Sequence, residues 1–158
     1  MIILGIDPGT TTTGFGIIEA EKNNLKLLDY GIIETKPKKP LAEKLAEIYK
    51  DVKRVIKETK PDLIAVEQLF FFKNVKTAMA VGQARGVILL AAERNKISIL
   101  EFTPLQVKMA ITSNGRAEKQ QVQKMVQKIL NLKNLPKPDD AADALAVAIC
   151  CSNFRKFE

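Results

Sequence analysis

Four acidic residues interrupt apolar segments of this sequence and could perform chemistry together. Asp7 follows the run IILGI, and Glu67 ends the run DLIAVE. Asp140 and Asp143 lie three residues apart at the start of the otherwise apolar segment DDAADALAVA, a spacing that places them on one face of a helix. Gathered carboxylates repel one another and lose solvation energy, and a divalent cation offsets both costs. The four acids therefore predict a metal site whose oxygen ligands favour Mg²⁺ or Mn²⁺ over Zn²⁺.

Such a site would be suited to phosphodiester hydrolysis. Four carboxylates could neutralise two cations, and two ions roughly 3.5–4 Å apart can activate a water and stabilise a leaving oxygen. The sequence contains no histidine, so hydrolysis must depend on carboxylates, lysines or bound metal. Each acid also has a simpler explanation, since Asp7 and Glu67 could mark strand ends and Asp139 and Asp140 could cap a helix. Asp143 lies deeper in its helix and is harder to explain by capping.

These acids need a sheet and helices to bring them together. Apolar periodicity predicts strands over 2–7, 14–20, 25–34, 62–67 and 97–102, and helices over 41–59, 75–94, 104–111, 117–132 and 139–152. This order is typical of a five-stranded mixed α/β sheet flanked by helices, with its first three strands antiparallel and the last two entering through helical crossovers. Ligands of such sheets bind beyond the carboxyl ends of the central strands, where Asp7 and Glu67 fall.

Length and composition limit the function classes. The chain has 158 residues and fits a single domain over 1–158, and its net charge of +7 favours a polyanionic partner such as nucleic acid or an acidic membrane surface. No apolar run approaches the about 18 residues of a membrane span, and the first residues do not resemble a signal peptide, so we expect a cytoplasmic protein with no membrane partner. The adjacent Cys150 and Cys151 favour neither a disulfide with each other nor a zinc site.

The segment GIDPGTTTTGFG, residues 5–16, has two interpretations. It could be a phosphate-binding turn, as in actin-like ATPases and sugar kinases, or it could present a metal-binding carboxylate, as in nucleases of the ribonuclease H type. The first requires two related domains and a second glycine-rich loop, and this chain is too short for both and offers no such loop. A ribonuclease H-like nuclease that cleaves RNA would share the metal site, and a binding module without turnover would not need all four acids.

Six segments together resemble the crossover junction endodeoxyribonuclease RuvC family over nearly the full length. They are ILGIDPGT…TGFGII, AVEQLFFFKN, GQARGV, EFTPLQVK, GRAEKQQVQKMV and DDAADALAVAI. The resemblance implies a ribonuclease H-like fold, a homodimer, and metal-dependent resolution of four-way (Holliday) DNA junctions by two symmetric nicks during recombination and repair. It also implies a preferred base sequence at the cut and a branch-migration motor, RuvA and RuvB, as partner.

The resemblance also assigns the catalytic acids. The family's four metal-binding positions fall on Asp7, Glu67, Asp140 and Asp143 and would hold two Mg²⁺ per subunit, which Mn²⁺ can replace. The third acid belongs at the first position of a D-A-A-D pattern, which selects Asp140 over Asp139. Asp7 is expected to bridge the two ions.

Five further residues are candidates for DNA contact. The family position that matches Phe70 lies near the junction centre and can stack on an unpaired base, although core packing is the alternative. Lys108, Arg116 and Lys119 cluster around the turn SNGRAEK, where they would contact phosphates or form an ordinary solvated face. Arg85 in GQARG is the fifth candidate, with anchoring of a loop as the alternative.

Small residues form a stripe along the helix predicted over 75–94. Ala78, Gly82 and Gly86 permit close approach of another backbone. They either pack tightly on the sheet or form the seam of a two-fold dimer, which suits a substrate with approximate two-fold symmetry. The sequence leaves this choice open.

Overall fold

The computed structural model describes residues 1–22, 24–69 and 75–154. Its strands are β1 (Ile2–Asp7), β2 (Thr12–Glu21), β3 (Asn24–Glu34), β4 (Leu63–Glu67) and β5 (Ser98–Phe102). Its helices are α1 (Leu41–Thr59), α2 (Val75–Arg94), α3 (Pro104–Thr112), α4 (Lys119–Ile129) and α5 (Asp139–Phe154). The predicted order of strands and helices is confirmed, and most predicted ends fall within two residues of the observed ones.

The five strands form one mixed sheet in the order β3-β2-β1-β4-β5. Strands β1, β2 and β3 are antiparallel neighbours, whereas β4 pairs in parallel with both β1 and β5. The expected mixed sheet is therefore confirmed. Ile6 of β1 pairs with Val66 of β4, so Asp7 and Glu67, the last residues of these two adjacent strands, lie at the same end of the sheet.

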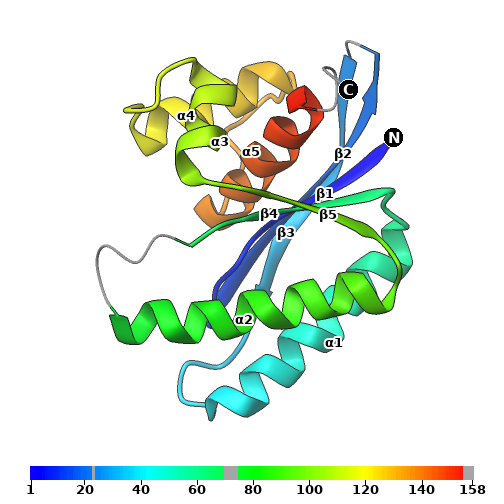
Figure 1. The fold of residues 1–158 in the computed structure, drawn as a ribbon. Helices are drawn as coiled ribbons and strands as arrows, with labels where there is room; N and C mark the ends of the chain where they lie inside the picture. The colour runs from blue at the N-terminus through cyan, green and yellow to red at the C-terminus, as the bar shows by residue number, and fades with distance from the viewer. Residues whose placement is uncertain (23, 70–74, 155–158) are drawn as a thin grey trace.

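Helices cover both faces of the sheet. Figure 1 shows α3, α4 and α5 on one face and α1 and α2 on the other. Each face has its own apolar core. One core joins alternate residues of the strands to α3, α4 and α5, and the other joins the intervening strand residues to α1 and α2. Two of the four candidate acids, Asp140 and Asp143, belong to α5 and so lie on this first face.

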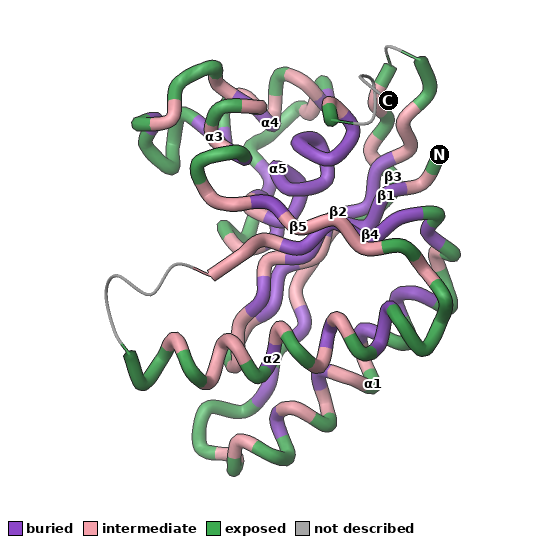
Figure 2. The backbone as a smooth tube through the Cα atoms, viewed as in Figure 1, coloured by how far each residue is buried: buried purple, intermediate pink, exposed green. Residues whose placement is uncertain are grey.

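Helix α5 is buried along nearly its whole length (Figure 2). Its sequence DDAADALAVAICCSNF is small and apolar on every side after the first turn, which is the composition of a helix enclosed by other elements. Cys150 and Cys151 are both buried and neither forms a disulfide, so the expectation that they do not form one with each other is confirmed.

Glycines in β1 and β2 allow α5 to lie directly on the sheet. An added Cβ at Gly14 would lie 1.9 Å from the carbonyl oxygen of Asp140, and one at Gly5 would lie 2.2 Å from the carbonyl oxygen of Ala144. A Cβ at Gly16 would also collide with a leucine of α5. These distances are far below van der Waals contact, so only glycine permits this approach. The glycines of the first hairpin therefore set the position of the helix that carries two of the acids.

Helix α2 has the opposite character. Its buried residues lie on the face toward α1 and the sheet, whereas Val75, Met79 and Leu90 are exposed. Their spacing places them on one stripe of the helix together with Gly82 and Gly86. An added Cβ at Gly86 would meet nothing within 4 Å, and one at Gly82 would touch only a leucine side chain at 3.8 Å. Tight packing of these glycines on the sheet is therefore excluded.

Among the described helices, α2 is also the one whose length and composition alone would allow it to cross a membrane. The prediction that no apolar run approaches such a span concerned uninterrupted runs, and Lys76 and Arg85 interrupt the apolar residues of α2. The observation is weak support for a membrane span, since core helices of soluble proteins meet the same criterion. Arg85 forms an ion pair with Glu101 of β5, which fixes α2 to the sheet.

Candidate metal centre and DNA-contacting residues

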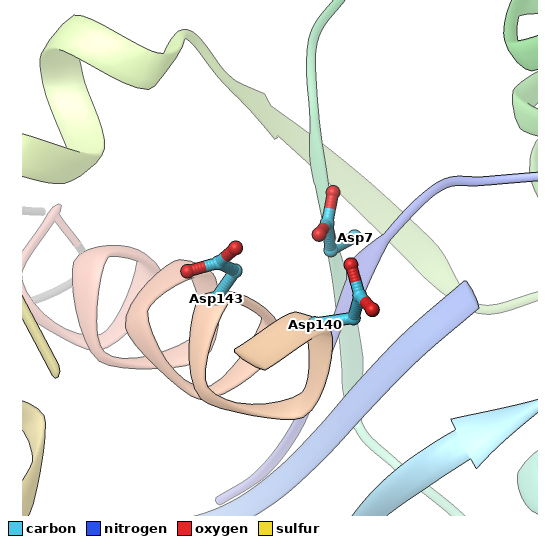
Figure 3. Close-up of side chains that lie close together, drawn as sticks. All are labelled: Asp7, Asp140 and Asp143. Carbon is cyan, nitrogen blue, oxygen red and sulfur yellow. The ribbon is translucent and has the colours of Figure 1, made fainter. Parts of the chain in front are cut away.

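Three carboxylates converge where β1 meets the first turns of α5. Figure 3 shows Asp7 at the end of β1 facing Asp140 and Asp143. One carboxylate oxygen from each of the three lies within 4.8 Å of the others. Two features of the fold produce this geometry, namely the i, i+3 spacing on α5 and the glycine contact that brings Asp140 above β2.

Glu67 joins this group from the neighbouring strand. Its side chain is hydrogen-bonded with that of Asp7. It also lines a cavity of about 270 Å³ together with Asp143, Lys108 and Lys119. The structure thus brings all four predicted acids to one edge of the sheet.

Burial and mutual repulsion make this cluster electrostatically unfavourable. Burial, followed by the charge of Glu67, raises the pKa of Asp7 well above its usual range. Burial and the charge of Asp143 raise the pKa of Glu67 to about 7, and its hydrogen bond with Asp7 limits that rise. Burial also raises the pKa of Asp143. Ionised carboxylates held this close require a compensating cation.

Lys119 supplies part of that compensation. Its Nζ lies 2.9 Å from Oδ2 of Asp143 and 3.7 Å from Oδ2 of Asp139. Partial burial lowers the pKa of Lys119, but the hydrogen bond and charge of Asp143 outweigh this and raise it overall. The Asp139 side chain is 61% exposed, against 27% for Asp143. It is Asp140, and not Asp139, that belongs to the three-acid group.

The donor set fits a divalent cation. Every candidate ligand atom is a carboxylate oxygen, and the closest three lie within the span of one coordination sphere. Hard cations prefer such ligands, and one lysine cannot neutralise four acids. The family resemblance and this acidic cluster both indicate divalent metal use.

The other candidates occupy different surroundings. Lys108 of α3 lines the same cavity as Glu67 and Lys119. Arg116 is exposed on the α3–α4 turn, where its backbone N–H donates to Oδ1 of Asn114, 3.0 Å away. Arg85 lies on α2 and pairs with Glu101, away from the cavity lining. Phe70 lies outside the described residues.

Sequence reasoning missed the positioning role of the glycines. Gly5, Gly14 and Gly16 were considered only as parts of a phosphate-binding turn or a loop after a carboxylate. Gly14 and Gly16 alternate in β2 and therefore face the same side, and they pair with Asp7 and Gly5 of β1. A patch without side chains on a sheet, together with an alanine-rich segment elsewhere in the chain, could have indicated a close helix–sheet contact.

Comparison with known proteins agrees with this site. The family described as crossover junction endodeoxyribonuclease RuvC matches residues 3–151. The chain belongs to that family. A RuvC of Desulforamulus reducens is 55% identical over 150 residues, which cover 95% of this chain and 92% of that protein.

Solved RuvC structures share the fold. The Thermus thermophilus RuvC structure superposes with a TM-score of 0.92 at 35% identity, covering 99% of this chain and 96% of that one. The structure of T. thermophilus RuvC in complex with a Holliday junction substrate gives a TM-score of 0.90 at 33% identity, with the same coverage. The ribonuclease H-like fold expected from the RuvC resemblance is confirmed, and the actin-like ATPase interpretation is not favoured.

Proposed function

We propose that this RuvC family member resolves four-way (Holliday) DNA junctions by paired symmetric nicks during recombination and repair, with Asp7, Glu67, Asp140 and Asp143 as its catalytic metal ligands. The observation that carries the assignment of residues is the convergence of Asp7, Asp140 and Asp143 within 4.8 Å. The substrate is supported by the family itself and by the T. thermophilus relative solved with a junction.

The proposed cofactor is two Mg²⁺ per subunit, which Mn²⁺ can replace. Asp7 belongs to the three-acid group with Asp140 and Asp143 and also interacts with Glu67, which supports the proposal that it would contact both ions. When bound, the ions supply an activated water and charge stabilisation for the leaving oxygen. The protein holds its four carboxylates at fixed positions on β1, β4 and α5, so little reorganisation is needed.

Basic residues beside the acids would hold the DNA backbone. Lys108 and Lys119 line the acidic cavity and can donate to phosphate oxygens next to the cleaved bond. Arg116 is exposed on the turn between their helices and can reach a phosphate further along the strand. Phe70 remains a prediction for base stacking. Arg85 remains a predicted DNA contact, although its ion pair with Glu101 favours the alternative anchoring role.

The proposed assembly is a homodimer through α2. The stripe of Val75, Met79, Gly86 and Leu90 is exposed and apolar, and the open space over Gly86 lets a partner helix approach. A two-fold axis along this stripe would pair two identical surfaces and present two metal sites to one junction.

Three further assignments complete the proposal. The nuclease domain is single and spans residues 1–158. A branch-migration motor of RuvA and RuvB is its partner. Its location is the cytoplasm. Family membership supports each of the three.

A cleavage assay on an end-labelled four-way junction tests the function, alongside a linear duplex and an RNA–DNA hybrid of matching sequence. We expect paired symmetric nicks on the junction alone, lost with EDTA and in Asp140→Asn. The matched control is Asp139→Asn, which alters the adjacent exposed acid and should retain cleavage. Cleavage of the hybrid instead would contradict the proposed substrate, and equal loss in both variants would contradict the choice of Asp140.

A further inference from the structure

Lys44 is a buried cation without an acidic partner. It lies near the start of α1 and is only 8% exposed. Its Nζ donates to Oγ1 of Thr11 at 3.3 Å, and among the described residues Lys44 forms no ion pair. Lysines are rarely this buried unless an acid pairs with them. A neutral hydroxyl leaves the positive charge of Lys44 uncompensated.

The loop that Lys44 contacts is continuous with the catalytic strand. Thr11 belongs to residues 8–11, which follow Asp7 directly. Thr35 holds the same loop, because its hydroxyl donates to the Thr10 carbonyl at 2.6 Å and its N–H donates to the Thr11 carbonyl at 2.9 Å. These contacts hold the β1–β2 loop, the β3–α1 segment and the start of α1 together beyond the end of β1, where Asp7 lies.

Lysines predominate at this end of the sheet: Lys36, Lys38, Lys39 and Lys44 lie between residues 36 and 44, against the single acid Glu43 in the first turn of α1. Lys36 and Lys38 are exposed and form no ion pair among the residues described, whereas Lys39 pairs with Glu47. Helix α1 begins after Pro40 with no side-chain cap, so its first N–H groups have no side-chain acceptor and the positive end of its dipole lies beside these lysines. An anion would satisfy the buried ammonium, the exposed lysines and the free helix end together.

We infer that Lys44, Thr11 and the start of α1, with Lys36 and Lys38, bind a backbone phosphate of the DNA, on the face of the sheet opposite to the helices of Lys108 and Lys119 (Figure 1). The inference rests on the proposed nuclease function and extends it. The contact is independent of base sequence, because every element of the site recognises charge. This phosphate contact would direct the DNA strand along residues 8–11, the loop that follows Asp7.

The salt dependence of junction binding tests this contact. Binding is measured by fluorescence anisotropy in EDTA, which prevents cleavage, for the wild type, Lys44→Met and Lys44→Arg. The matched control is Lys50→Met, which removes an exposed lysine elsewhere on α1. We expect the log–log slope of affinity against salt to become shallower by about 0.9 in Lys44→Met, and to stay unchanged in Lys44→Arg and Lys50→Met.

A folded Lys44→Met with the wild-type salt slope would overturn the inference. If its melting temperature were also lowered, Lys44 would have only a structural role in holding the β1–β2 loop. If Lys44→Met fails to fold, the exposed pair Lys36→Gln/Lys38→Gln decides, and an unchanged slope there overturns the inference. Failure of the wild type to bind junctions at all would remove both the inference and the proposed function, whereas wild-type binding and cleavage with unchanged variant slopes would remove the inference alone.

Discussion

Helix α5 packs directly against glycines of β1 and β2 on one face of the sheet, whereas helix α2, on the opposite face, exposes an apolar stripe on the side away from the sheet. On the α5 side, the helix lies so close to Gly5, Gly14 and Gly16 that an added Cβ would overlap it. This close packing holds two aspartates of α5 beside Asp7. On the α2 side, the glycines meet open space and large apolar side chains are exposed. The two faces therefore differ in what they can do: one fixes the geometry of the acidic cluster, and the other exposes the apolar stripe that we propose as the dimer interface.

The strongest way to break the α5 arrangement is a single methyl group on β2. Gly14→Ala places a Cβ against the Asp140 carbonyl and must displace the start of α5. We expect a loss of stability of about 3 kcal/mol and a loss of cleavage of at least about 100-fold, because the acids no longer converge. Urea unfolding and junction cleavage measure the two effects. Wild-type values for both would show that α5 can shift without consequence.

A charge on the α2 stripe tests the other face. Met79→Asp puts a carboxylate on a surface that the proposed dimer buries, while leaving the interior of the monomer untouched. We expect the dimer dissociation constant to rise about 10- to 100-fold, which corresponds to about 1.4 to 2.8 kcal/mol. Sedimentation equilibrium measures it, with Lys50→Asp as a control on exposed α1. An unchanged dissociation constant would place the seam elsewhere.

The pH dependence of stability distinguishes the acidic face from the apolar one. The folded protein keeps a proton on Glu67 up to a pKa of about 7, while the ordinary glutamate pKa is 4.5. Unfolding therefore releases a proton between these values, and stability falls as pH rises through this window. We expect a loss of roughly 1 to 3 kcal/mol between pH 5 and pH 8 in EDTA.

Urea unfolding at the two pH values measures this loss, with Glu67→Gln as the matched control. The stability of the variant should depend less on pH, because the contribution of Glu67 is removed. Some dependence should remain, because the pKa values of Asp7 and Asp143 are also raised. Added Mg²⁺ should reduce the loss in the wild type, since metal binding favours the ionised acids. A stability that rises with pH in EDTA would contradict the account of the cluster.

The smallest expected effect sharpens the contrast between the two sets of glycines. Gly86→Ala adds its methyl to open space on α2, and alanine favours a helix over glycine by about 0.5 to 1 kcal/mol. We expect the monomer unit to keep its fold and its Mg²⁺ affinity, measured by circular dichroism and calorimetry. A clear loss of Mg²⁺ affinity in Gly86→Ala would mean that the two faces are not independent.

Local patterns predicted most of the secondary structure, because each element is either an apolar period or an apolar run bounded by polar and turn residues. The ends were less certain where apolar spacing continued past a cap. The helix predicted over 117–132 is α4 (Lys119–Ile129), because Glu118 forms a capping box with Gln121 and Asn131 adopts a left-handed φ of 51°. Leu130 and Leu132 continue the apolar spacing of the preceding helical residues, although the backbone has already left the helix.

The acids could be predicted from sequence, whereas their partners could not. Asp7, Glu67, Asp140 and Asp143 stand out because each interrupts an apolar segment. The pairing of Lys119 with Asp143 and of Arg85 with Glu101 depends on how distant segments pack, which no single segment encodes. The glycine stripe of α2 likewise had two interpretations until the open space over Gly86 removed one of them.

A crystal structure with Mn²⁺, read through its anomalous scattering, tests the central claim most directly. The account predicts two anomalous peaks in the acidic cluster, both within coordination distance of Asp7, with Glu67 on one ion and the aspartates of α5 shared between them. An empty cluster with Lys119 still paired to Asp143, at Mn²⁺ concentrations that support junction cleavage, would contradict it.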